Sequence, residues 1–147
     1  MKKGEARFIR QYNKAGYFAL VKLEAESEWN TLDITTDCHG NGFTAQGYIE
    51  EVPANGYDDW KQGAINGVKF ALEAINKQNT KVIITHIEGL TTDTNPTIVA
   101  AAAARALWNA LEIEVSEVTE KNMEDFVLQS WSNDAFFIPA NNFLISK

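Results

Sequence analysis

The sequence has a single cysteine, Cys38, and no apolar run close to the length of a membrane-spanning helix. One cysteine excludes a disulfide within the chain and is typical of a reducing compartment. A helix that spans a bilayer needs about 20 apolar residues, so an integral membrane protein is excluded. The basic residues at the start are not followed by an apolar stretch, so no secretory signal is expected. These absences predict a cytoplasmic protein with no membrane partner.

The chain has 147 residues, of which 45% are hydrophobic and 22% are charged. This length and composition are typical of one globular domain with its own core, and they exclude a disordered chain. No repeat, low-complexity segment or linker divides the sequence. We therefore expect a single domain over residues 1–147, and the sequence does not predict its oligomeric state.

The charge is distributed unevenly. A net charge of −7 excludes a protein that coats nucleic acid non-specifically. Residues 1–22 hold six bases and one acid, a net charge of +5, and the rest of the chain holds seven bases and nineteen acids, a net charge of −12. Residues 112–134 alone hold seven acids and one base. This pattern permits a local RNA contact at the basic N-terminal segment and a basic protein partner at the acidic segment.

Hydrophobic periodicity predicts the elements of the fold. Strict alternation predicts strands, and apolar residues at three- and four-residue steps predict helices. The expected strands cover residues 8–11, 17–25, 32–36 and 81–89, with an irregular edge segment at 43–52 and short end strands at 135–139 and 143–146. The expected helices cover residues 57–77, 96–111 and 120–131, with Asn95 as the N-cap of the second and Thr119 as a cap of the third.

This order of elements predicts an α+β fold. It is expected to be a two-layer sandwich in which helices cover one face of a small mixed sheet, with an extra C-terminal helix. Gly63 and Gly67 lie four residues apart inside the first helix, where each costs about 1 kcal/mol relative to Ala. Because they share one face, they allow another backbone to come close, and the alanine run at 100–104 is the expected partner.

The sequence shows no motif that carries chemistry. Walker A and dinucleotide-binding fingerprints are absent, so no cofactor is expected. Cys38 and His39 are adjacent, which seldom places both side chains on one ion, and no second ligand pair exists, so no metal is expected. Cys38 and His86 lack a local signature of a nucleophile and its base. The acids Asp58 and Asp59 are explained by the favourable first turn of a helix. We therefore expect no catalytic residues and a chain that is not an enzyme.

Three segments, in order along the chain, resemble domain IV of elongation factor G. Residues 10–21 carry its Arg-Gln pair, glycine-bearing turn, aromatic residue and valine. Residues 47–63 are similar to its approach to the first helix, and residues 87–95 to its strand and glycine-containing loop before an alanine-rich helix. The resemblance covers residues 7–112 and leaves 113–147 as a C-terminal extension.

The resemblance implies a split β-α-β fold with a left-handed crossover. It also implies that two loops, residues 12–16 and 90–95, form a tip, which in that family reaches the decoding site of the small ribosomal subunit. In this chain the residues expected to bind RNA or a partner through the tip are Arg10, Gln11, Asn13, Lys14, Thr91, Thr92 and Asp93. Arg10 and Lys14 would pair with phosphates.

Three functions follow from these observations. The first is a non-enzymatic module that binds the ribosome or a translation complex through the tip loops. The second is a protein-interaction or immunity-like module whose acidic residues 112–134 meet a basic partner. The third is a small enzyme, because a fold does not fix a function. The first is the main prediction.

Overall fold

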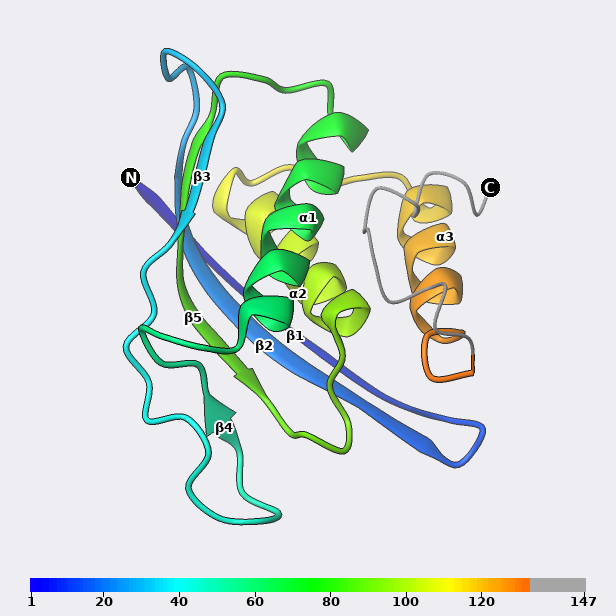
Figure 1. Ribbon diagram of the computed structural model, residues 1–147. Helices are drawn as coiled ribbons and strands as arrows, with labels where there is room; N and C mark the ends of the chain where they lie inside the picture. Colours follow the sequence, from blue (N-terminus) through cyan, green and yellow to red (C-terminus); the bar gives the residue numbers. More distant parts are fainter. Residues whose placement is uncertain (133–147) are drawn as a thin grey trace.

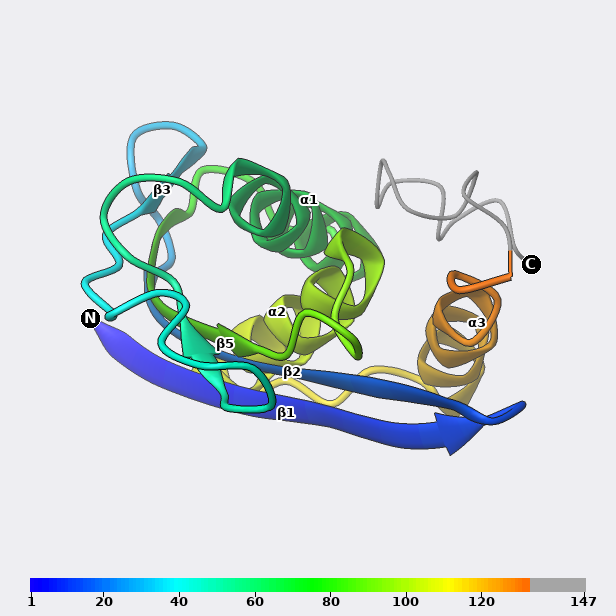
Figure 2. The same cartoon turned by 60° about the horizontal axis from the view of Figure 1, so that its bottom comes forward.

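A computed structural model describes residues 1–132 and shows one mixed sheet with three helices. The elements are β1 (Lys2–Tyr12), β2 (Ala15–Glu26), β3 (Asp33–Thr36), β4 (Glu50–Glu51), α1 (Asp58–Ala74), β5 (Lys81–Gly89), α2 (Pro96–Ala110) and α3 (Glu117–Val127). The helices lie on one face of the sheet (Figures 1 and 2). The predicted α+β sandwich is confirmed, and the end strands predicted at 135–139 and 143–146 lie outside the described residues.

The sheet has the order β1-β2-β5-β3, with β4 paired to the end of β5. β1 and β2 form a long antiparallel hairpin, β5 is antiparallel to β2, and β3 is parallel to β5. The chain runs from β3 through β4 and α1 to β5, and β3 and β5 are direct neighbours in the sheet. No strand separates them, in contrast to the split β-α-β unit that the resemblance implied.

β1 is longer than the four residues predicted for it, because small residues hide its alternation. Gly4, Ala6 and Phe8 face the helices, but only Phe8 gives a strong apolar signal. A Cβ atom at Gly4 would lie 2.1 Å from the carbonyl oxygen of Ala106, so β1 contacts α2 closely. The hairpin then turns at Asn13 and Lys14, whose φ values of 50° and 65° fit a two-residue turn.

The predicted close approach between α1 and α2 is confirmed. A Cβ atom at Gly63 would lie 2.4 Å from the carbonyl oxygen of Pro96, and one at Gly67 would lie 2.1 Å from that of Ala100. Gly63 and Gly67 of α1 thus contact Pro96 and Ala100 of α2 in the same order along the chain, so the two helices run parallel. Both therefore begin at the same end of the fold, the lower end in Figure 1.

α3 closes one side of the core with Met123, Phe126 and Val127, which are buried. It begins three residues earlier than predicted, because its cap is the Ser116 hydroxyl, which accepts a hydrogen bond from the Thr119 amide at 3.1 Å. Within residues 1–132, no helix is both long and apolar enough to cross a membrane.

Candidate functional site

The two predicted tip loops meet near the turn of the β1–β2 hairpin. The Phe18 amide donates to the carbonyl oxygen of Asp93 at 2.8 Å, and the Thr94 hydroxyl donates to that of Phe18 at 2.6 Å. A Cβ atom at Gly16 would lie 2.7 Å from the Asp93 carboxylate, so glycine lets the loop lie against β2. Of the predicted site residues, the structure thus brings Asp93 to the hairpin.

Four of the other predicted residues are exposed. Gln11, Asn13 and Lys14 are exposed on the hairpin beyond this contact, and Thr92 is exposed on its own loop. Asn13 and Lys14 form the turn itself, so they lie at the far end of the hairpin (Figure 1). The predicted residues of the hairpin and those of the loop after β5 thus come from two segments that meet at Gly16 and Asp93.

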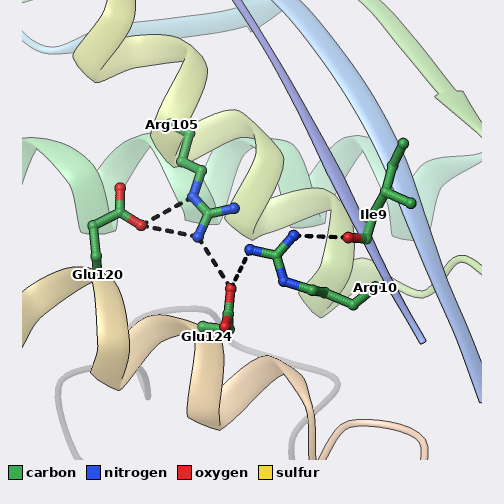
Figure 3. A network of polar contacts seen from close by, with 5 residues as sticks. All are labelled: Ile9, Arg10, Arg105, Glu120 and Glu124. Carbon is green, nitrogen blue, oxygen red and sulfur yellow. Dashed lines mark hydrogen bonds and ion pairs between the residues drawn. The ribbon is translucent and has the colours of Figure 1, made fainter. Parts of the chain in front are cut away.

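Arg10 contacts α3 through its guanidinium group, although its side chain remains 42% exposed (Figure 3). Its Nη2 lies 2.5 Å from Glu124 Oε1, which also lies 3.5 Å from Arg105 Nη2. Arg105 in turn lies 2.9 Å from Glu120 Oε2. Both guanidinium groups lie 5.1 Å from the centre of the Phe8 ring. Arg10, which was expected to contact phosphate, is therefore paired with Glu124. Glu124 and Glu120, two acids of the segment that was expected to meet a basic partner, are both paired with Arg105.

Thr91 binds the buried carboxylate of Glu50, which the sequence did not predict to be a binding residue. Glu50 is 4% exposed, and it accepts hydrogen bonds from the Tyr57 hydroxyl at 2.7 Å, from the Thr91 amide at 3.0 Å and from the Thr91 hydroxyl. Burial alone would raise the pKa of Glu50, but the hydrogen bonds from Thr91 and Tyr57 outweigh it and lower the pKa below its ordinary value. Burial, with the adjacent carboxylate, raises the pKa of Tyr57 to about 12, so its hydroxyl remains a donor.

A cavity of about 360 Å³ opens beside these residues, between the first turns of α1 and α2. Trp60 and Trp131 line it together with Asp59, Thr91 and Asn95. An adjoining shallow pocket is formed by Tyr57, Asp58, Asp59 and Trp60. Asn95 caps α2 as predicted, because its side chain accepts from the Ile98 amide at 2.9 Å. The sequence places Trp60 and Trp131 on helix stripes, and only the tertiary fold brings them together.

Exposed apolar side chains lie on the loop that leads into β4. Phe43, Tyr48 and Ile49 are 61%, 67% and 48% exposed. The loop is closed at its base, where the Gly42 amide donates to the carbonyl oxygen of Glu51 at 2.7 Å. Because Ile49 directly precedes Glu50, this loop adjoins the Glu50 cluster at the lower end of Figure 1.

Neither a metal centre nor a nucleophile with its base is formed by the residues singled out for those roles. Within residues 1–132, no three His, Cys, Asp or Glu side chains are grouped to hold a metal ion. His86 Nε2 lies 2.6 Å from Glu88 Oε2, and His39 Nε2 lies 2.7 Å from Asp37 Oδ1. The Cys38 thiol is buried and donates to the carbonyl oxygen of Ile84 at 3.7 Å.

No protein-family model and no curated protein matches the chain. Among solved structures, the chain is similar to mevalonate kinase from methicillin-resistant Staphylococcus aureus, with 15% identity and a TM-score of 0.42. The match covers 88% of this chain and 45% of the kinase, so the chain spans less than half the length of that protein.

This match corrects two predictions. The similar structure is a kinase and not an elongation factor, so the assignment to domain IV of elongation factor G is wrong. The prediction that the chain is not an enzyme is wrong on the same finding. The motifs misled because they report local packing: Gly16 is needed where the Asp93 carboxylate approaches, and the alanine run is needed opposite Gly63 and Gly67. The likeness is too weak to give this chain an activity.

Proposed function

We propose that the chain is a protein-interaction module whose contact surface lies at the end of the fold where α1 and α2 begin. The observation that carries the proposal is the exposed apolar group of Phe43, Tyr48 and Ile49. Exposed aromatic and large aliphatic side chains that gather in one place are typical of protein contacts. The β4 pairing and the Glu50 hydrogen bonds hold this loop at its base, so a partner would meet an ordered surface.

The charge at this end favours a protein partner over RNA. Glu51, Asp58 and Asp59 are exposed near the apolar group, and Asp93 lies on the neighbouring loop. Nucleic-acid binding depends on basic residues that neutralise phosphates. The hairpin turn beside the Asp93 loop carries a single base, Lys14, and Arg10 is paired with Glu124. The proposal therefore keeps the basic protein partner of the second function predicted from the sequence. It places the contact surface at this end of the fold and not at residues 112–134.

Photo-crosslinking from a single position tests this proposal. A photoreactive amino acid would replace Tyr48 in the full chain, and Leu32, which is 45% exposed, is the matched control at another loop. We expect a protein adduct from position 48 that resists RNase and is absent from position 32. An RNA adduct, or the same adducts from both positions, would overturn the proposal.

Substitutions then separate the surface from the fold. Phe43→Ser combined with Tyr48→Ser should abolish capture of the crosslinked protein, and Leu32→Ser should leave it unchanged. If both variants captured the partner protein equally well, the proposed contact surface would be wrong. The buried free thiol of Cys38 supports the cytoplasm as the place of this interaction.

A further inference from the structure

The two tryptophans of the cavity are held in fixed positions. A Cβ atom at Gly89 would lie 2.8 Å from Trp60 Cη2, so the glycine lets the indole lie directly against the end of β5. The Tyr57 ring lies 5.0 Å from the Trp60 ring, at a tilt of 56°. Trp131 Nε1 donates to the carbonyl oxygen of Gly16 at 2.9 Å. A ligand would therefore meet rings that lose little freedom on binding.

The charged side chains that line the cavity and its adjoining pocket are acidic. Asp59 lines both, Asp58 lines the pocket, and no Lys, Arg or His side chain of residues 1–132 lines either one. The N-terminus of each helix opposes these charges with about half a positive charge. Two full carboxylate charges exceed that contribution, and the Asn95 side chain already satisfies the Ile98 amide at the start of α2. The local field therefore favours a cation.

Aromatic rings and a negative field together select positively charged groups. The face of an aromatic ring attracts a cation, and tryptophan attracts it most strongly. This fold already uses that contact elsewhere: Lys81 Nζ lies 4.6 Å from the Trp29 ring centre, and Arg10 and Arg105 lie over Phe8. Because Lys81 already lies over its ring, Trp29 provides an internal comparison for cation binding at Trp60.

We propose that the cavity between Trp60 and Trp131 binds a cationic side chain, arginine or lysine, that the protein partner inserts beside the Phe43, Tyr48 and Ile49 surface. The inference rests on the proposed function and adds the chemistry of the partner. The exposed apolar group provides contact area, and Asp58 and Asp59 attract the basic segment. A volume of about 360 Å³ accommodates one long side chain with its charged end.

Nuclear magnetic resonance of the indole N–H groups tests the proposal on the full chain. The probe is a hexa-arginine peptide, with hexa-lysine as a second arm and hexa-citrulline as the neutral control. We expect the cationic peptides to shift the Trp60 and Trp131 signals. The Trp29 signal and that of Trp108, which is buried against α1, should not move. Shifts of the same size at Trp29 and Trp60, or a response to the citrulline peptide, would overturn the proposal.

A pair of charge variants adds a quantitative test. Asp59→Asn should weaken hexa-arginine binding by up to about fivefold, the upper limit expected for one exposed charge pair. Glu73→Gln removes the same charge from an exposed position at the other end of α1 and should leave binding unchanged. Equal weakening by both variants would mean that peptide binding depends on net charge alone, and it would overturn the proposed binding in the cavity.

The two proposals fail in different ways. If crosslinking from position 48 finds a protein partner but the peptides leave Trp60 and Trp131 unmoved, the cation site is wrong and the interaction module stands. If the peptides move both indoles but no protein adduct forms at position 48, the cavity binds a cation and the interaction surface is wrong.

Discussion

Replacing Glu50 with Gln tests whether one buried carboxylate holds the loops of the proposed surface together. Glu50 lies in β4, and its three donors come from Tyr57 at the start of α1 and from Thr91 on the loop after β5. One side chain thus connects β4 to the start of α1 and to a loop that is 41 positions away in the sequence. Gln has nearly the same shape as Glu, so the substitution removes the charge and keeps the volume.

The structure sets the expected loss of stability. A hydrogen bond to a charged group contributes about 1.5–3 kcal/mol, and a bond between neutral groups about 0.5–1.5 kcal/mol. Neutralising the acceptor of three bonds therefore removes about 3 kcal/mol, and the easier burial of a neutral amide offsets part of this. We expect Glu50→Gln to lower the free energy of unfolding by about 1–2 kcal/mol at pH 7. Glu50→Ala should cost about 3 kcal/mol or more, because it leaves the donors of Tyr57 and Thr91 unpaired.

The effect should depend on pH in one direction. Burial would raise the pKa of Glu50, but the hydrogen bonds from Thr91 and Tyr57 hold it below the ordinary value of 4.5. A carboxyl group with a lowered pKa adds stability above the pKa of the unfolded chain, and this stability is lost as the pH falls through the folded pKa. The difference in unfolding free energy between the wild type and Glu50→Gln should be constant above about pH 5 and shrink at lower pH.

Urea denaturation followed by tryptophan fluorescence measures this difference at pH 7 and at pH 3.5. Titration of the other carboxyl groups affects both proteins alike and cancels in the difference. Glu51→Gln is the matched control, because Glu51 is the exposed neighbour and should change stability by less than about 0.5 kcal/mol. A Glu50→Gln loss that is the same at both pH values would refute the role of the charge.

Three further variants test the packing and the charge pairs. Gly67→Ala should lower the unfolding free energy by about 1–2 kcal/mol in urea, because the contact with the Ala100 carbonyl outweighs the gain in helix propensity; a more stable variant would contradict the close approach. Asn95→Ala should cost about 1–2 kcal/mol in thermal melts through loss of the α2 cap, and an unchanged melting temperature would contradict it. A double-mutant cycle with Arg10→Gln and Glu124→Gln should give a coupling of about 0.5–1 kcal/mol that weakens in 1 M salt, and zero coupling at low salt would contradict the pair.

Local patterns predict most of the fold because each pattern has one dominant physical cause. The β5 bounds agree with the prediction, since β-branched residues on both faces are typical of a central strand. The Asn95-Pro96 pair predicts the start of α2, because the cap and the fixed proline φ act within one turn. The start of α3 was missed, because Ser116 and Thr119 both can cap a helix and only the fold selects Ser116.

The candidate surface is less predictable, because its members meet only through tertiary contacts. Thr91 was expected to face a partner, and it instead binds Glu50, which is 41 positions earlier in the chain. Nothing in the Glu50-Glu51 pair marks the first acid as buried and the second as exposed. Trp60 and Trp131 come from α1 and from the turn after α3, so no sequence spacing connects them.

Part of the charge segregation along the chain becomes an internal contact in the fold. Lys2 Nζ lies 3.9 Å from Glu112, and Arg10 Nη2 lies 2.5 Å from Glu124, so the basic N-terminal segment and the acidic segment face each other. A base that pairs with an acid of the same chain attracts a phosphate less, because the pair must first separate. Only charged side chains that are not paired within the chain are therefore available to attract a partner. Near the proposed surface that remainder includes Asp58, and for this reason the expected partner is basic even though the sequence opens with a basic segment.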